Sequence, residues 1–120
     1  MGRRADEPLT PLSMAILLAL LDGEQHGYAL MREVEAQTDG ALVPGTGSLY
    51  AALERLMGQG LIVESVRRPR TGEDGRRRYY RITPAGRAAA RAEAERMMRV
   101  VEAARARALI GDRPRLRRAD

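Results

Sequence analysis

The feature that most constrains the fold is a change in the spacing of apolar residues after Gly60. Before this glycine, apolar side chains recur every three or four residues, which is the period of an amphipathic helix. From Leu61 to Ile82 the chain is rich in β-branched and aromatic residues and is interrupted by turn residues, which is typical of two strands and a loop. The helical period returns after Pro84. We therefore expect a mainly α-helical fold with a small β-hairpin.

Three short helices are predicted before this change. Thr10 and Pro11 favour a helix start, because a threonine oxygen can cap a helix and proline lacks the N–H that has no partner there. The pair Asp22-Gly23 ends this helix. The second helix is expected from near His26 to about Gln37, and the third, with Thr46 as its cap, from Ser48 to about Gly58.

The predicted hairpin carries a concentration of positive charge. Its strands are expected over Leu61–Val66 and Arg77–Ile82, and the alternation in the second places Arg78, Tyr80 and Ile82 on one face. The chain has a net charge of +5, and six arginines fall in or beside the loop: Arg67, Arg68, Arg70, Arg76, Arg77 and Arg78. Because these cations repel one another, a polyanion such as DNA is the favoured partner.

A long helix is predicted from Thr83-Pro84 to about Leu109. Steps of four and three residues define an apolar seam of the coiled-coil type. At about 26 residues this helix would be roughly 39 Å long and would overhang the rest of the domain. We expect a homodimer, although the helix could instead fold back on its own domain. The expected dimer contacts are Ala90, Ala94, Met97, Val101, Ala104 and Ala108, with Leu12 and Ile16 from the first helix.

The composition excludes several classes of function. There is no cysteine and only one histidine, His26, so disulfides, thiolate zinc sites, histidine metal cages and Ser-His-Asp triads are ruled out. We expect no metal, no cofactor, no catalytic residue and no enzyme activity. The longest apolar run, Met14 to Leu21, is too short to span a bilayer, and the amino terminus lacks an apolar signal segment. We therefore expect a cytoplasmic protein without a membrane partner.

Three short helices followed by a basic hairpin predict a winged helix-turn-helix. In such a domain the third helix enters the major groove of double-stranded DNA, and the hairpin, or wing, contacts the backbone or minor groove. Glu54 on this helix is expected to pair with a neighbouring arginine. The expected DNA-binding residues are Thr46, Ser48, Tyr50 and Arg55 on the helix and Arg68, Arg70, Arg76, Arg77 and Arg78 on the wing.

The expected organisation has four parts. Residues 1–9 form a flexible amino-terminal arm and residues 10–83 the winged helix-turn-helix domain. Residues 84–110 form the carboxy-terminal dimerisation helix, and residues 111–120 a basic tail. An alternative function stays open, since a winged helix can also dock an acidic protein partner.

The ordered set of motifs resembles the PadR family of bacterial transcriptional regulators. The matching segments begin with Leu12–Leu21 and continue with His26–Leu30, Gly47–Leu56, Gly60–Ile62 and Gly75–Gly86. The resemblance implies a winged helix with a carboxy-terminal dimerisation region, of the short subfamily with a single long helix. It also implies a regulator, mostly a repressor, that binds an inverted-repeat operator as a homodimer, with Ser48, Tyr50, Arg77 and Arg78 at DNA-contacting positions.

The resemblance leaves the effector open. In one group of the family, flat drugs stack between tryptophans at the dimer centre. This chain has no tryptophan and no phenylalanine, so such a ligand is not expected. A smaller effector that relieves repression, or none, is compatible with the sequence.

Overall fold

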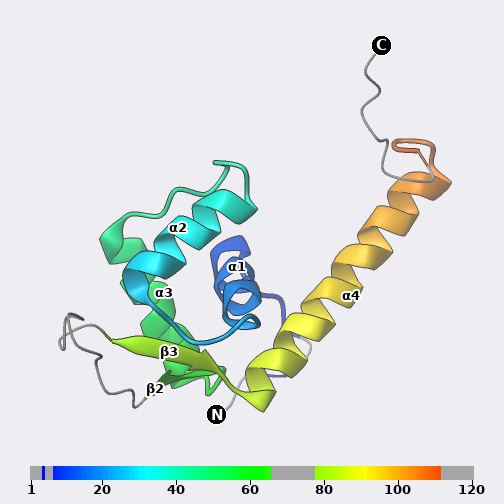
Figure 1. Ribbon diagram of the computed structural model, residues 1–120. Coiled ribbons are helices and arrows are strands. Elements are labelled where there is room, and N and C mark those ends of the chain that lie inside the picture. The colour runs from blue at the N-terminus through cyan, green and yellow to red at the C-terminus, as the bar shows by residue number, and fades with distance from the viewer. Residues whose placement is uncertain (1–3, 5–6, 66–77, 112–120) are drawn as a thin grey trace.

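A computed structural model describes residues 4, 7–65 and 78–111 of the chain (Figure 1). The elements, in order, are α1 (Pro11–Leu20), β1 (Gln25–His26), α2 (Gly27–Gln37), α3 (Thr46–Gly58), β2 (Ile62–Ser65), β3 (Tyr79–Ile82) and α4 (Pro84–Ala106). Three short helices pack over one small sheet, and α4 extends away from them. This arrangement confirms the mainly α-helical fold with a small β-hairpin.

The helix starts follow local capping chemistry. The Thr10 hydroxyl accepts a hydrogen bond from the Ser13 N–H at 3.1 Å, as predicted for α1. The Thr83 hydroxyl accepts from the Gly86 N–H at 3.0 Å, which confirms the start of α4. The prediction for α3 is wrong, because the cap is Gly45. Thr46 is the first helical residue, and no side chain caps this helix.

The sheet has three antiparallel strands in the order β1-β3-β2. On the central strand β3, Tyr80 faces Gln25 of β1 on one side and Glu64 of β2 on the other. The strand β1 has only two residues, too few to show an alternating pattern, and sequence reasoning missed it. Tyr80 and Ile82, which the alternation placed on one face, are both buried, whereas Arg78, just before the strand, is exposed.

The core is built around α1, which is buried along most of its length. Leu30 and Val34 of α2, the inner face of α3, and Ile62 and Tyr80 of the sheet complete it. Ile16 has an exposed fraction of 0% in the single chain. The prediction that Ile16 contacts a second chain is therefore wrong, because the core of its own chain already covers it. Leu12 is only partly buried against this core.

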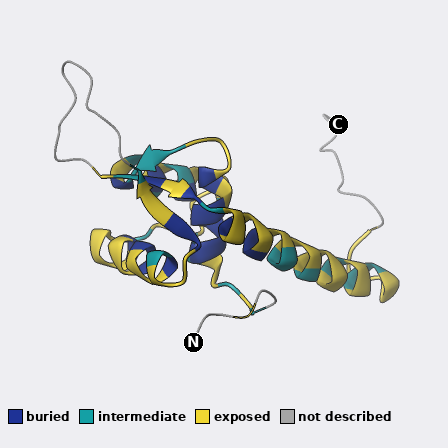
Figure 2. Cartoon of the chain, turned by 90° about the horizontal axis from the view of Figure 1, so that it is seen from below, coloured by how far each residue is buried: buried dark blue, intermediate teal, exposed yellow. Residues whose placement is uncertain are grey.

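The helix α4 packs against the body only through its first turns. Gly86, Ala89 and Ala90 are buried there, and beyond them the helix is largely exposed as it leaves the domain (Figure 2). Ala90 belongs to the core of its own chain, so its assignment to the dimer seam is wrong. Ala108 lies beyond the helix, because α4 ends at Ala106 and Ala108 has a left-handed φ of 61°, so it does not continue the helical seam. Its contact with a second chain stays a prediction.

Two contacts fix the direction in which α4 leaves the body. Gly86 lies so close to the start of β2 that a Cβ there would stand 2.7 Å from Cγ1 of Ile82 and 3.1 Å from the carbonyl carbon of Leu61. The Glu93 carboxylate accepts hydrogen bonds from the Leu9 N–H at 2.8 Å and from Arg96 at 2.7 Å. These contacts tie α4 to β2 and to the segment that precedes α1.

Candidate nucleic-acid interface

The two faces of α3 differ sharply in side-chain size. Leu49, Ala52, Leu53 and Leu56 are buried and hold the helix on the core. The opposite face is exposed, and Gly47, Ala51 and Gly58 lie along its middle. Because these residues carry at most a methyl group, the helix backbone lies close to the surface. A helix with such a face can approach the floor of a DNA major groove closely.

A groove of about 450 Å³ separates α3 from β3. Tyr50 and Glu54 line it from the helix, and Arg78 and Tyr80 line it from the strand side. The structure thus brings together two of the predicted DNA-binding residues, Tyr50 and Arg78. Tyr50 is 42% exposed, so part of its side chain is available to a ligand that enters the groove, and the hydroxyl end of the ring lies against Gly27 of α2.

The charged side chains that line this groove, Arg78 and Glu54, differ in whether they form an ion pair. The Arg78 Nε lies 3.4 Å from Oε1 of Glu64, and its side chain is still 69% exposed. Among the described residues Glu54 forms no ion pair. Its predicted pairing with an arginine stays a prediction, because the wing arginines before Arg78 lie outside the described residues. Burial raises the pKa of the Tyr80 phenol, and the nearby Tyr50 and the Glu64 carboxylate act in the same direction. Within the described residues, the groove therefore holds an accessible cation beside a carboxylate that forms no ion pair.

The remaining predicted contacts do not line this groove. Thr46 and Ser48 are exposed in the first turn of α3, and Arg55 is exposed in its last turn. By helical spacing, Ser48 and Arg55 share the flank of α3 opposite to Tyr50. Four predicted wing residues lie outside the described residues: Arg68, Arg70, Arg76 and Arg77.

The amino end of α2 lies directly beside α3. Gly27 is buried against the Tyr50 ring, and a Cβ at this position would stand 2.8 Å from Cζ of Tyr50. His26 caps α2, because its Nδ1 accepts from the Ala29 N–H at 3.2 Å, and its ring packs edge-on against Tyr79 at 5.4 Å. This glycine lets the Tyr50 side chain lie across the start of α2.

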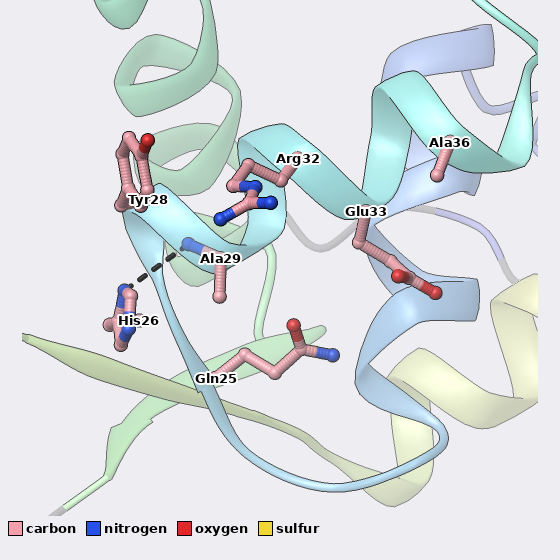
Figure 3. A pocket seen from close by; sticks show the side chains of 7 residues that line it. All are labelled: Gln25, His26, Tyr28, Ala29, Arg32, Glu33 and Ala36. Atoms are coloured by element: carbon pink, nitrogen blue, oxygen red, sulfur yellow. Dashed lines mark hydrogen bonds between the residues drawn. The ribbon is translucent and has the colours of Figure 1, made fainter.

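A shallow surface depression of about 570 Å³ lies on α2 next to this contact (Figure 3). Tyr28 is 58% exposed, and the Arg32 guanidinium carbon lies 5.9 Å from the centre of its ring. Sequence reasoning did not assign either residue to the site. A single arginine on a helix forms no recognisable pattern, so the sequence contains no signal for Arg32. The only sequence signal for Tyr28 was its position directly after the helix start.

Other classes of site find no support in the part of the chain that the structure describes. Within these residues no group of three or more His, Asp or Glu side chains is placed to hold a metal ion. None of the described helices has both the length and the apolar character required to cross a bilayer.

Comparisons with known proteins agree with this geometry. Residues 16–92 match the model of the Transcriptional regulator PadR-like family. A transcriptional regulator from Clostridium thermocellum is 30% identical, with a TM-score of 0.65 over 77% of this chain and 84% of that chain. A PadR family transcription regulator from Clostridium difficile, 20% identical, shares the fold with a TM-score of 0.66 over 84% of this chain and 100% of that chain.

This chain also resembles part of a longer curated protein. An uncharacterised 37.1 kDa protein in transposon TN4556 of Streptomyces fradiae is 42% identical over 87 residues. The match covers 72% of this chain but only 23% of that protein's length.

Proposed function

The chain belongs to the PadR-like family of transcriptional regulators, and from that premise we propose that it is a repressor that binds an inverted-repeat operator as a homodimer. Family membership makes it a DNA-binding regulator of transcription rather than an enzyme. The single observation that carries the proposal is the exposed, small-residue face of α3 beside a groove with Tyr50 and Arg78. A regulator of this kind works where the chromosome lies, so the proposal includes a cytoplasmic location.

In the proposed complex α3 is the recognition helix. Its exposed face lies in the major groove, and Thr46, Ser48 and Arg55 contact base edges or phosphates from it. Tyr50 and Arg78 bind the backbone that passes between α3 and the wing. Arg68, Arg70, Arg76 and Arg77 extend this basic surface along the wing. Tyr28 and Arg32 add phosphate contacts from the start of α2, because the first helix of a helix-turn-helix crosses the backbone.

The homodimer is proposed because α4 leaves apolar surface uncovered. Met97, Met98 and Val100 are each more than half exposed on the projecting part of this helix. Ala94, Met97, Val101 and Ala104 form the seam that a second copy would cover, with Leu12 at its base. Such a dimer reads two half-sites about one DNA turn, or a multiple of it, apart.

A small effector that releases the DNA is the remaining part of the proposal. An apolar groove of about 340 Å³ lies between α1, the end of α2 and α4. Met14, Leu18, Leu42 and Met97 line it, and Glu93 is the acidic residue at its edge. A ligand that wedges into this groove would change how α4 sits on α1.

The test is selection of bound fragments from the source genome with the purified protein. We expect recovered fragments to share an inverted repeat upstream of a gene whose transcription falls when the protein is added. Binding should weaken steeply with salt, because phosphate contacts release counterions. Tight binding to an acidic protein without binding to any duplex at low salt would favour the docking-module alternative.

A matched pair of variants tests the site. Arg78→Ala should weaken binding to all duplexes and reduce the salt slope by about one. Arg87→Ala, which removes an exposed arginine from α4, serves as the control for total charge. Equal effects of the two substitutions would show that only net charge matters, and would contradict the placement of DNA at Arg78.

A further inference from the structure

We propose that Glu54 selects a cytosine in the operator by accepting a hydrogen bond from its amino group. The inference rests on the proposed function, because it needs α3 to lie in the major groove. It concerns the one acidic side chain on the exposed face of that helix.

The shape of α3 makes Glu54 the most prominent side chain in the middle of this face. Ala51 lies one turn before it and Gly58 one turn after it, and all three are exposed. Gly47 continues the same line toward the start of the helix. Because these neighbours present only hydrogen atoms or a methyl group, the Glu54 carboxylate extends beyond them. In a major groove it reaches the base edges while the backbone around it stays close.

No described residue forms an ion pair with Glu54. Arg78, the described arginine in the same groove, forms its ion pair with Glu64 instead. Arg55, the next residue of α3, forms no ion pair with Glu54 in the described structure. An unpaired carboxylate on a DNA-facing surface is repelled by phosphate. A base that supplies a hydrogen-bond donor to the carboxylate offsets this repulsion in a specific complex.

The chemistry of the base edges indicates which donor this is. In the major groove guanine offers two acceptors and thymine offers an acceptor and a methyl group, and neither satisfies a carboxylate. Adenine has an amino donor, but the acceptor N7 beside it would face the second carboxylate oxygen. Cytosine presents its N4 amino group without an adjacent ring acceptor in the groove. A carboxylate therefore favours cytosine over the other three bases.

The experiment measures affinity for the selected operator, for every single base-pair substitution in it, and for a random duplex at the same salt. The wild-type chain should lose about 10- to 100-fold in affinity when one particular C·G pair is changed. Glu54→Gln should shift the preference at that pair toward adenine, because an amide pairs with adenine N6 and N7. Glu54→Ala should bind all four bases there alike. Both variants should bind the random duplex several-fold more tightly.

Glu35→Gln is the matched control. Glu35 is exposed on α2 and its loss changes the net charge by the same amount. This variant should keep the wild-type preference at every position of the operator. Unchanged base preferences in Glu54→Ala, or an equal gain of affinity for all sequences, would overturn the inference while leaving DNA binding intact. A wild-type chain that binds no duplex would instead overturn the proposed function itself.

Discussion

Replacing Gly86 by alanine should destabilise the whole domain, although alanine is the better helix former. Gly86 lies in the first turn of α4, where the helix meets the start of β2. A Cβ there would stand 2.7 Å from Cγ1 of Ile82 and 3.1 Å from the carbonyl carbon of Leu61, whereas ordinary contact begins at 3.4 Å. Its nearest neighbour would be the Leu61 carbonyl oxygen, which belongs to the backbone and cannot rotate away.

The expected loss follows from these contacts. Adding a group to a packed site costs about 1–3 kcal/mol. Moving α4 away would also weaken the hydrogen bond from the Thr83 N–H to the Leu61 carbonyl, now 3.0 Å long, with a net value of about 1 kcal/mol. Alanine regains up to about 1 kcal/mol through its helix propensity. We therefore expect Gly86→Ala to lower the free energy of unfolding by about 2 kcal/mol.

The assay is thermal unfolding followed by circular dichroism at one fixed protein concentration, because association with a second chain would raise the midpoint. Gly86→Ala should lower Tm by roughly 10 °C. The control is Gly58→Ala, at an exposed position of α3 where a Cβ would meet nothing within 4 Å. That variant should gain about 0.5–1 kcal/mol. A Gly86→Ala variant as stable as the wild type would refute the close packing of α4 on β2.

Two further predictions test the groove between α3 and β3. Gly27→Ala should displace the Tyr50 ring, whose outer end can move, so duplex affinity should fall about tenfold, as expected for one lost phosphate contact, with little change in Tm. Tyr50→Phe should match that loss, and unchanged affinity in both variants would exclude a DNA contact at this hydroxyl. The pKa of Tyr80 is raised in the folded state, so the folded chain keeps this proton at pH values where the unfolded chain loses it. Stability should therefore be fully present below pH 10 and decline as the pH rises above it, and urea titrations of Tyr80→Phe should show a smaller decline.

The parts of the fold that depend on neighbouring residues could be predicted from the sequence. Thr10 and Thr83 cap their helices as expected, because a cap needs only a side-chain oxygen three residues before its donor. The cap of α3 was missed because Gly45 has no side-chain oxygen and is recognised only by its extended backbone. The two-residue strand β1 was missed because it exists only through pairing with β3, which is distant in sequence.

Spacing alone could not separate residues that pack within the chain from those that face a partner. Ala90 and Ala94 share one helical stripe, yet Ala90 is buried by its own chain and Ala94 is exposed. The difference depends on where α4 leaves the body, which the spacing does not record. The pairing of Glu54 depends on tertiary structure in a similar way. Whether an arginine reaches it depends on how the wing lies against α3, and Arg78 instead meets Glu64 across the sheet.

The anchoring of α4 by its first turns alone has a mechanical consequence. From Ala90 to its end at Ala106 the helix is about 25 Å long. A rotation of about 10° at the anchored end moves the free end by roughly 4 Å, which exceeds the rise of one base pair of about 3.4 Å. If two chains are joined at these free ends, a small movement at the hydrogen bond between Leu9 and Glu93 produces a larger displacement at the far end of α4. The distance between the two recognition helices is then set by a few contacts far from the DNA.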